Sequence, residues 1–219
     1  ATMNDPIAIE IVSDAVCPWC WIGKRRLDRA LAALPHLAVE RVWRPFMLNP
    51  EMPAEGMPRD TYLAAKFGAE KLARLYDPLI EIGKAEAIPF DFAAITTMPS
   101  SLNAHRLMRW ARSAGVQPEV VEILFRRYFA EGQNIGEAGV LLAAAEEAGM
   151  DMEIVTELLA SDADADLVRR EDTLARQIGV SGVPTFVIQG KWALVGAQPA
   201  EHWVDVLTRV AAGADLAAG

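Results

Sequence analysis

The residues in this sequence best suited to chemistry are two cysteines in the segment Cys17-Pro18-Trp19-Cys20. They are the only cysteines among 219 residues, which is too few for a disulfide scaffold. Two cysteines three positions apart are typical of a redox-active pair or of half a metal site. In a redox pair, a thiolate at Cys17 would attack a disulfide and Cys20 would resolve the resulting mixed disulfide.

Three other interpretations of the pair are weaker. A zinc site would need two further ligands, and the three histidines, His36, His105 and His202, form no close pair. Covalent haem attachment requires a histidine directly after the second cysteine, where this chain has Trp21. A structural disulfide that closes so short a loop would add little stability. We therefore expect redox chemistry and no metal.

The chain around the pair predicts a strand, a helix and a second strand. Residues 7–12 are rich in β-branched side chains, as in a buried strand. Apolar residues then recur at spacings of three and four over residues 18–34, which indicates a helix, and Pro35 ends it. Residues 37–46 return to a strand pattern. This order is a βαβ unit.

The start of that helix favours a thiolate at Cys17. Pro18 suits the first helical position, where a missing N–H costs nothing. The Cys17 sulfur would face the free backbone N–H groups of Trp19 and Cys20 and the positive end of the helix dipole. Cys20 belongs to the apolar face, so we expect it to be less exposed than Cys17. Trp19 should be exposed beside Cys17. Three other tryptophans are expected in the core: Trp21, Trp43 and Trp110.

The middle of the chain has a different pattern. Residues 49–58 hold three prolines and one glycine and form a loop. Helical patterns then dominate to about residue 160. We place these helices at 59–67, 69–86, 100–114, 117–131, 137–148 and 151–160.

Strand character returns near the C-terminus. A helix over 162–178 leads to a strand hairpin over 185–195 and a last helix over 199–212. Without the middle segment the order is β-α-β and then α-β-β-α, which is the thioredoxin fold. We predict an α/β protein in which residues 1–48 and 162–219 form a thioredoxin-like domain. Residues 49–161 form a large inserted all-helical domain.

The segment before the hairpin, Gly179-Val180-Ser181-Gly182-Val183-Pro184-Thr185-Phe186, carries a second signal. By itself, Val-Pro before a strand is an ordinary turn. In a thioredoxin fold a cis-proline stands here and faces the first cysteine, and a cis X–Pro bond is infrequent. The Val183 backbone would then pair with an extended substrate segment like an added strand.

Together with several other segments, the two motifs make the sequence resemble the FrnE-like branch of the DsbA family of thiol-disulfide oxidoreductases over roughly residues 7–211. The segments that carry the resemblance are Asp14 to Arg25, Trp43 to Gly56, Asn103 to Leu107, Phe129 to Gly132 and Gly179 to Phe186. The resemblance implies a redox pair at Cys17 and Cys20 and a cis bond before Pro184. It implies substrate contacts from Pro18, Trp19, Val183 and Pro184.

Two departures from periplasmic relatives bear on the redox character. Those relatives carry His where this chain has Trp19, and a buried acid where it has Ile11. A protonated His would stabilise the thiolate and Trp19 cannot, while Asp14 would oppose the thiolate by charge repulsion. We therefore expect a reductase or isomerase that rests as the dithiol.

His105 and Arg106 are the candidates for a contribution from the helical domain. Related 2-hydroxychromene-2-carboxylate isomerases and kappa-class glutathione transferases use this region near bound glutathione. Solvated side chains or pairs with glutamates are the simpler interpretation. A glutathione-dependent isomerase or transferase is the alternative function, but those relatives typically have Ser in place of Cys17. A non-enzymatic binding or chaperone-like protein is a third class.

Charge and hydropathy restrict the partners. The chain has 21 basic and 30 acidic residues, a net charge of −9, which disfavours nucleic acid and anionic membranes. No apolar run approaches the roughly 20 residues of a membrane span, and no signal peptide pattern is visible. We expect a cytoplasmic protein without a cofactor, acting on client proteins or low-molecular-weight thiols, with glutathione as a candidate redox partner. The oligomeric state stays open.

Overall fold

The computed structural model describes residues 5–218, and its centre is a four-stranded sheet in the order β2-β1-β5-β6. β1 (Ile7–Ser13) runs parallel to β2 (Val39–Pro45) and antiparallel to β5 (Thr185–Ile188). β5 forms an antiparallel hairpin with β6 (Trp192–Val195). In this sheet the central strand β1 ends directly before the loop that carries the two cysteines.

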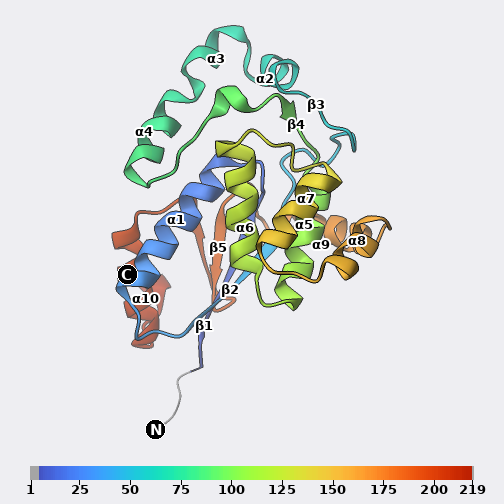
Figure 1. Cartoon of the computed structure of the whole chain (residues 1–219). Helices are drawn as coiled ribbons and strands as arrows, with labels where there is room; N and C mark the ends of the chain where they lie inside the picture. The colour runs from blue at the N-terminus through green and yellow to red at the C-terminus, as the bar shows by residue number, and fades with distance from the viewer. Residues whose placement is uncertain (1–4, 219) are drawn as a thin grey trace.

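Helices cover both faces of the sheet (Figure 1). α1 (Pro18–Ala33) and α10 (Ala200–Ala211) pack side by side over one face. There Phe186 meets Trp203 edge to face, with ring centroids 4.9 Å apart. α9 (Ala165–Gln177) lies on the other side, where a small separate apolar cluster forms from Val12, Phe46 and Ala175. The alternation of strand side chains between the two faces explains this division.

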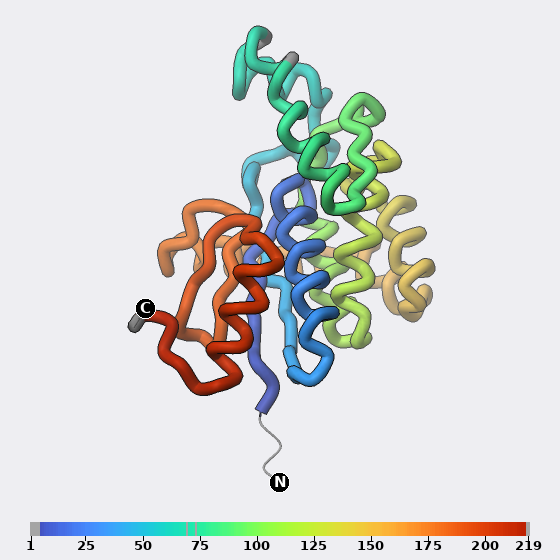
Figure 2. The backbone as a smooth tube through the Cα atoms, turned by 90° about the vertical axis from the view of Figure 1, so that its left-hand side faces the viewer, coloured from blue at the N-terminus to red at the C-terminus, as the bar shows by residue number. Residues whose placement is uncertain are grey.

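Between β2 and α9 the chain forms two groups of helices. The first group, here called the helical arm, lies beyond the N-terminal end of α1 in both views (Figures 1 and 2). The arm consists of α2 (Arg59–Phe67), α3 (Ala69–Leu75) and α4 (Asp77–Ala85). The second group packs beside β2 and α1. It consists of α5 (Leu102–Ser113), α6 (Gln117–Phe125), α7 (Ala138–Glu147) and α8 (Met152–Leu159).

Short elements complete the chain. β3 (Met57–Pro58) and β4 (Thr97–Met98) pair antiparallel at the base of the helical arm. A π-helix, Arg126–Ala130, continues α6. Two 3₁₀ turns span Phe92–Ala94 and Leu216–Ala218.

The predicted thioredoxin fold with an inserted helical segment is confirmed, with two corrections. The helix expected over 69–86 is two helices that break at Tyr76. Pro78, in the first turn of α4, cannot continue a helix because it lacks an N–H and its ring clashes with the preceding turn. The segment is also not wholly helical, since β3 and β4 lie within it. The division at residues 48 and 161 stays a prediction, because one contiguous apolar core runs through both parts.

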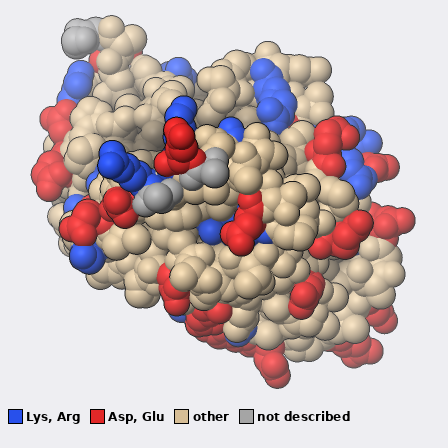
Figure 3. Space-filling model, turned by 90° about the horizontal axis from the view of Figure 1, so that it is seen from above, with Lys and Arg blue, Asp and Glu red and all other residues tan. Residues whose placement is uncertain are grey.

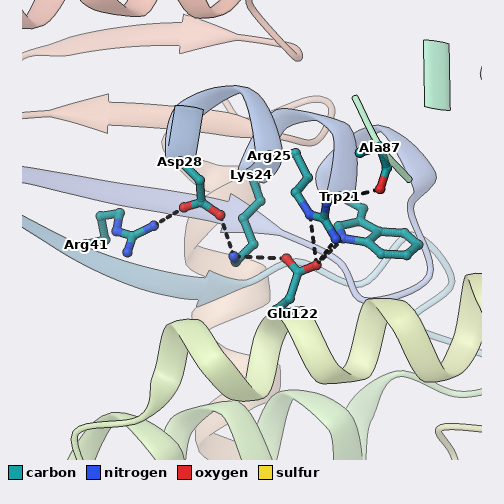
Figure 4. Close-up of polar contacts among 7 residues, drawn as sticks. All are labelled: Trp21, Lys24, Arg25, Asp28, Arg41, Ala87 and Glu122. Carbon is teal, nitrogen blue, oxygen red and sulfur yellow. Dashed lines mark hydrogen bonds and ion pairs between the residues drawn. The ribbon is translucent and has the colours of Figure 1, made fainter. Parts of the chain in front are cut away.

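An ionic network joins α1 to α6 and β2 (Figure 4). Lys24 Nζ lies 2.7 Å from Asp28 Oδ2 and 3.0 Å from Glu122 Oε2. The other oxygen of Glu122 accepts hydrogen bonds from Trp21 Nε1 at 2.9 Å and Arg25 Nη2 at 2.6 Å. Lys24 is buried, so this network compensates a charge that would otherwise be costly inside the protein.

Among the residues that the structure describes, no helix is both long and apolar enough to cross a membrane.

Candidate active site

Cys17 and Cys20 lie at the first turn of α1, and both thiols are free. Cys17 is the N-cap residue, with φ −100° and ψ 115°, and Pro18 occupies the first turn. The Cys20 N–H donates to the Cys17 carbonyl over 3.1 Å, while the Cys17 N–H donates to the Asp14 carbonyl at the same distance. These bonds fix the turn that carries the pair.

The surroundings of Cys17 differ from the expectation in two respects. Cys17 is 5 % exposed rather than open to solvent, nearly as buried as Cys20 at 3 %. Its sulfur caps no N–H of α1; instead the thiol donates to the Val183 carbonyl, with Sγ and O 3.7 Å apart. A thiol has a proton to donate, so in the reduced state the carbonyl is its better partner. Trp19 is 40 % exposed, as predicted.

The surroundings of Cys20 favour the protonated thiol over the thiolate. Burial, and next the adjacent Cys17, raise the pKa of the Cys20 thiol well above its usual value. The Ser13 side chain and the Asp14 backbone act in the opposite direction and are weaker. Since the thiolate is the nucleophile, this arrangement disfavours Cys20 as the first attacking group.

The hairpin loop approaches α1 closely at this point. The Val183–Pro184 bond is cis, as predicted, and Pro184 is buried. A Cβ added at Gly23 would lie 3.0 Å from the Pro184 ring and 3.2 Å from the Phe186 ring. Gly23 therefore allows the hairpin to reach the cysteines, because any side chain there would push the two elements apart.

We expect Gly23→Ala to lower the free energy of unfolding by about 1 kcal/mol. Overpacking costs roughly 1–3 kcal/mol, and the better helix propensity of alanine offsets about 1 kcal/mol of that. Gly139→Ala in α7, where no atom lies within 4 Å of the added Cβ, should instead stabilise the protein. Urea denaturation of both variants measures the difference, and equal stabilisation of both would contradict the steric role of Gly23.

Asp14 and His105 lie behind the active-site turn as a buried pair. The Asp14 side chain is fully buried, accepts from the Leu48 N–H over 2.7 Å, and its other oxygen lies 3.2 Å from His105 Nε2. The same ring nitrogen is 3.2 Å from the Phe46 carbonyl. The sequence predicted that Asp14 would act on the Cys17 thiolate by charge repulsion, and the structure adds that this carboxyl is buried and paired with His105. His105 therefore joins the helical segment to the loop before Cys17 and to the residue that follows β2.

Arg106, the second helical-domain candidate, lies elsewhere. Its guanidinium donates to the carbonyls of Leu158, Ser161 and Ala163 over 2.7 Å each, and it lies over the Trp110 ring. These contacts tie the end of α8 to α5. Adjacent positions on one helix point in different directions, which is why His105 reaches Asp14 in the turn before Cys17 and Arg106 does not.

A pocket of about 220 Å³ lies between the cysteine turn and the helical arm, and we call it the arm pocket. Cys17, Pro18 and Trp19 form one side of it, whereas Cys20 is not among its lining residues. The rest of its wall is mainly apolar, comes from distant segments, and contains six aromatic residues beside six aliphatic ones. Those aromatic residues are Tyr62, Phe67, Tyr76, Phe92, Tyr128 and Phe129.

The arm pocket has a charge opposite to that of the whole protein. Its two charged lining residues are cations, Arg59 and Lys66. Acidic side chains instead gather along much of the margin of the face shown in Figure 3, consistent with the net charge of −9. The sequence analysis missed this pocket, because Arg59 and the aromatic residues share no motif and meet only in the folded chain.

Comparison with known proteins identifies the family. The protein family described as "DSBA-like thioredoxin domain" matches this chain over residues 8–208. The chain belongs to this family. The sequence of this DSBA-like protein is 35 % identical to that of the probable DsbA oxidoreductase SCO1869 from Streptomyces coelicolor. The crystal structure of that protein matches this one with a TM-score of 0.85. That match covers 94 % of this chain and 90 % of the other, and it supports thiol-disulfide oxidoreductase activity at the level of the family.

Two other relatives of the DSBA-like protein are more distant. YwbO, an uncharacterised protein of Bacillus subtilis, is 27 % identical over 199 residues, which cover 87 % of this chain and 90 % of YwbO. The structure of the cytosolic disulfide reductase DsbM from Pseudomonas aeruginosa with GSH is 20 % identical, with a TM-score of 0.65 and coverage of 94 % and 99 %. At that identity DsbM shows the shared fold alone. Within the described part of the DSBA-like chain, no group of three or more His, Cys, Asp or Glu residues could hold a metal ion.

Proposed function

We propose that this protein is a dithiol-disulfide oxidoreductase of the FrnE-like branch that acts in the cytoplasm as a reductase or isomerase. The observation that carries the proposal is the different placement of the two thiols. Cys17 lines the arm pocket, whereas Cys20 is buried beside it with a raised pKa. Such a pair can form a mixed disulfide at Cys17 and then resolve it from Cys20.

We infer the direction of electron flow from the residues between the two cysteines, whereas Arg59 and Lys66 in the arm pocket act in the opposite direction. Trp19, between the cysteines, brings no positive charge to a thiolate. A thiolate with less stabilisation makes the reduced form less favoured, so the disulfide is a weaker oxidant. Reduction or isomerisation in a reducing compartment suits such a pair. Glutathione is the redox partner we propose, and the description of DsbM as cytosolic and with GSH supports both points.

The reduction potential tests this proposal. We expect equilibration in glutathione buffers, followed by alkylation and mass spectrometry, to give a potential close to the roughly −270 mV of thioredoxin. The strong periplasmic oxidants have potentials of about −120 mV. A value near theirs would contradict the reductase role and would point to Arg59 as a stabilising charge, since Arg106 is engaged elsewhere. Absence of any Cys17–Cys20 disulfide would contradict oxidoreductase activity itself.

A further inference from the structure

Two buried polar atoms of the arm pocket have no hydrogen-bond partner in the described part of the folded chain. Arg59 is 7 % exposed, and its Nη1 donates to the Phe92 carbonyl over 3.3 Å. Its Nε has no hydrogen-bond partner, and neither has the hydroxyl of Tyr76. Buried donors without an acceptor are uncommon in folded proteins, so these two suggest an acceptor that arrives with a ligand.

Electrostatics favour an anion as that ligand. Among the described residues no carboxylate lies within ion-pair distance of Arg59, although eleven other arginines form such pairs. The pocket lining also contains no acidic residue. Burial raises the pKa of Tyr76, with Arg59 acting against it, so the Tyr76 hydroxyl stays a neutral donor at physiological pH. A carboxylate would satisfy an arginine and a hydroxyl together.

The shape and lining of the pocket favour an aromatic group. The Arg59 guanidinium carbon lies 4.8 Å from the centroid of the Tyr76 ring, and Tyr76 stacks on Phe92 with centroids 4.1 Å apart. A cavity of roughly 150 Å³ accepts benzene, so about 220 Å³ accepts one substituted ring. A tripeptide such as glutathione is larger than this volume, so most of its atoms would lie outside the arm pocket.

We propose that the arm pocket recognises small aromatic disulfides that carry a carboxylate, with the carboxylate on Arg59 and Tyr76 and the disulfide at Cys17. This inference rests on the proposed function and names a substrate class for it. Lys66 lies at the pocket wall, hydrogen-bonded to the Tyr62 hydroxyl over 2.9 Å, and adds to the positive potential.

The reaction is a two-electron reduction of the substrate. The Cys17 thiolate attacks one sulfur of R–S–S–R, the substrate S–S bond breaks, and one RS⁻ leaves as the Cys17–S–S–R bond forms. Cys20 then loses its proton to solvent and attacks the Cys17 sulfur. The second RS⁻ leaves with the electron pair of the mixed disulfide, and a Cys17–Cys20 disulfide remains. A single turnover therefore needs no other reductant.

Stopped-flow kinetics of the fully reduced protein test the proposal. The probes are 5,5′-dithiobis(2-nitrobenzoate), an aromatic carboxylate disulfide, and 4,4′-dithiodipyridine, an aromatic disulfide without charge. We expect Arg59→Met to slow the reaction with the anionic probe by about 10- to 100-fold, the effect of losing a charge-assisted hydrogen bond. The reaction with the neutral probe should change less than about twofold, and Arg59→Lys should restore part of the rate.

Matched controls separate the possible failures. Arg74→Met removes the same charge from the exposed surface of α3, outside the pocket lining, and should leave both rates within about twofold. Equal slowing of both probes by Arg59→Met, or no slowing of the anionic one, would overturn the pocket proposal. The rate with each disulfide is divided by the rate at which a small free thiolate attacks the same disulfide, which removes the leaving-group effect. On this scale glutathione disulfide should gain less from the protein than the anionic probe, and the reverse would overturn the aromatic preference. A wild-type protein that reacts with neither probe would instead contradict the proposed function.

Discussion

Cys17→Ser should abolish disulfide exchange, whereas Cys20→Ser should stop the reaction at a mixed disulfide on Cys17. Serine has no thiolate to attack a disulfide, so the first variant cannot begin the cycle. In the second variant Cys17 still attacks, but no thiol next to it can release the bound group. With 5,5′-dithiobis(2-nitrobenzoate), the wild type should release two thiolates per chain and Cys20→Ser should release one. Cys17→Ser should release none on the time scale of the wild-type reaction.

Alkylation provides the independent check on these roles. Iodoacetamide at neutral pH should label Cys17 before Cys20, because Cys17 lines the arm pocket and burial raises the pKa of Cys20. Peptide mapping by mass spectrometry at short times identifies the labelled thiol. Both variants should keep the wild-type circular dichroism. Faster labelling of Cys20 would reverse the assignment of the attacking thiol.

Glu122→Gln should lower the free energy of unfolding at pH 7 by about 2 kcal/mol. Breaking a fully buried ion pair costs roughly 3–5 kcal/mol, but Glu122 is 27 % exposed and Lys24 keeps Asp28 as a partner. Glu157→Gln, at an exposed position of α8, should change stability by less than about 0.5 kcal/mol. Urea denaturation of the three proteins at low salt gives the comparison, because urea does not screen ion pairs as a salt would.

The same substitution has a pH signature. Burial by itself would raise the pKa of Glu122, but Lys24, Arg25 and Trp21 outweigh it and hold the pKa below its usual value. A carboxyl with a lowered folded pKa stabilises the protein above the unfolded value, about 4.3, and loses that effect as pH falls through the folded pKa. The difference between wild type and Glu122→Gln should therefore be full at pH 7 and shrink below about pH 4. A difference independent of pH would indicate a steric effect.

The position of the cysteine pair and its scaffold follow from local patterns in the sequence. The β-branched run at 7–12, Pro18 at a helix start and the apolar periodicity of α1 each act over a few residues. Together they place Cys17 at the N-terminus of α1 and Cys20 on its buried face. The glycine and proline segment before β5 likewise predicted the turn that brings Val183 to the Cys17 sulfur, once the order of elements had defined the fold.

Only the tertiary structure decided what surrounds the cysteines. Arg59, Tyr76 and Tyr128 come from three segments, and the arm pocket exists because α2 and α4 fold back over the start of α1. Burial of Asp14 and its contact with His105 span 91 positions of sequence. Local periodicity carries no information about such long-range contacts, because it reports which face of an element is buried and not what covers that face. The sequence therefore determined where the two thiols lie in the fold, and the packing of the inserted helices determined the pocket that Cys17 lines.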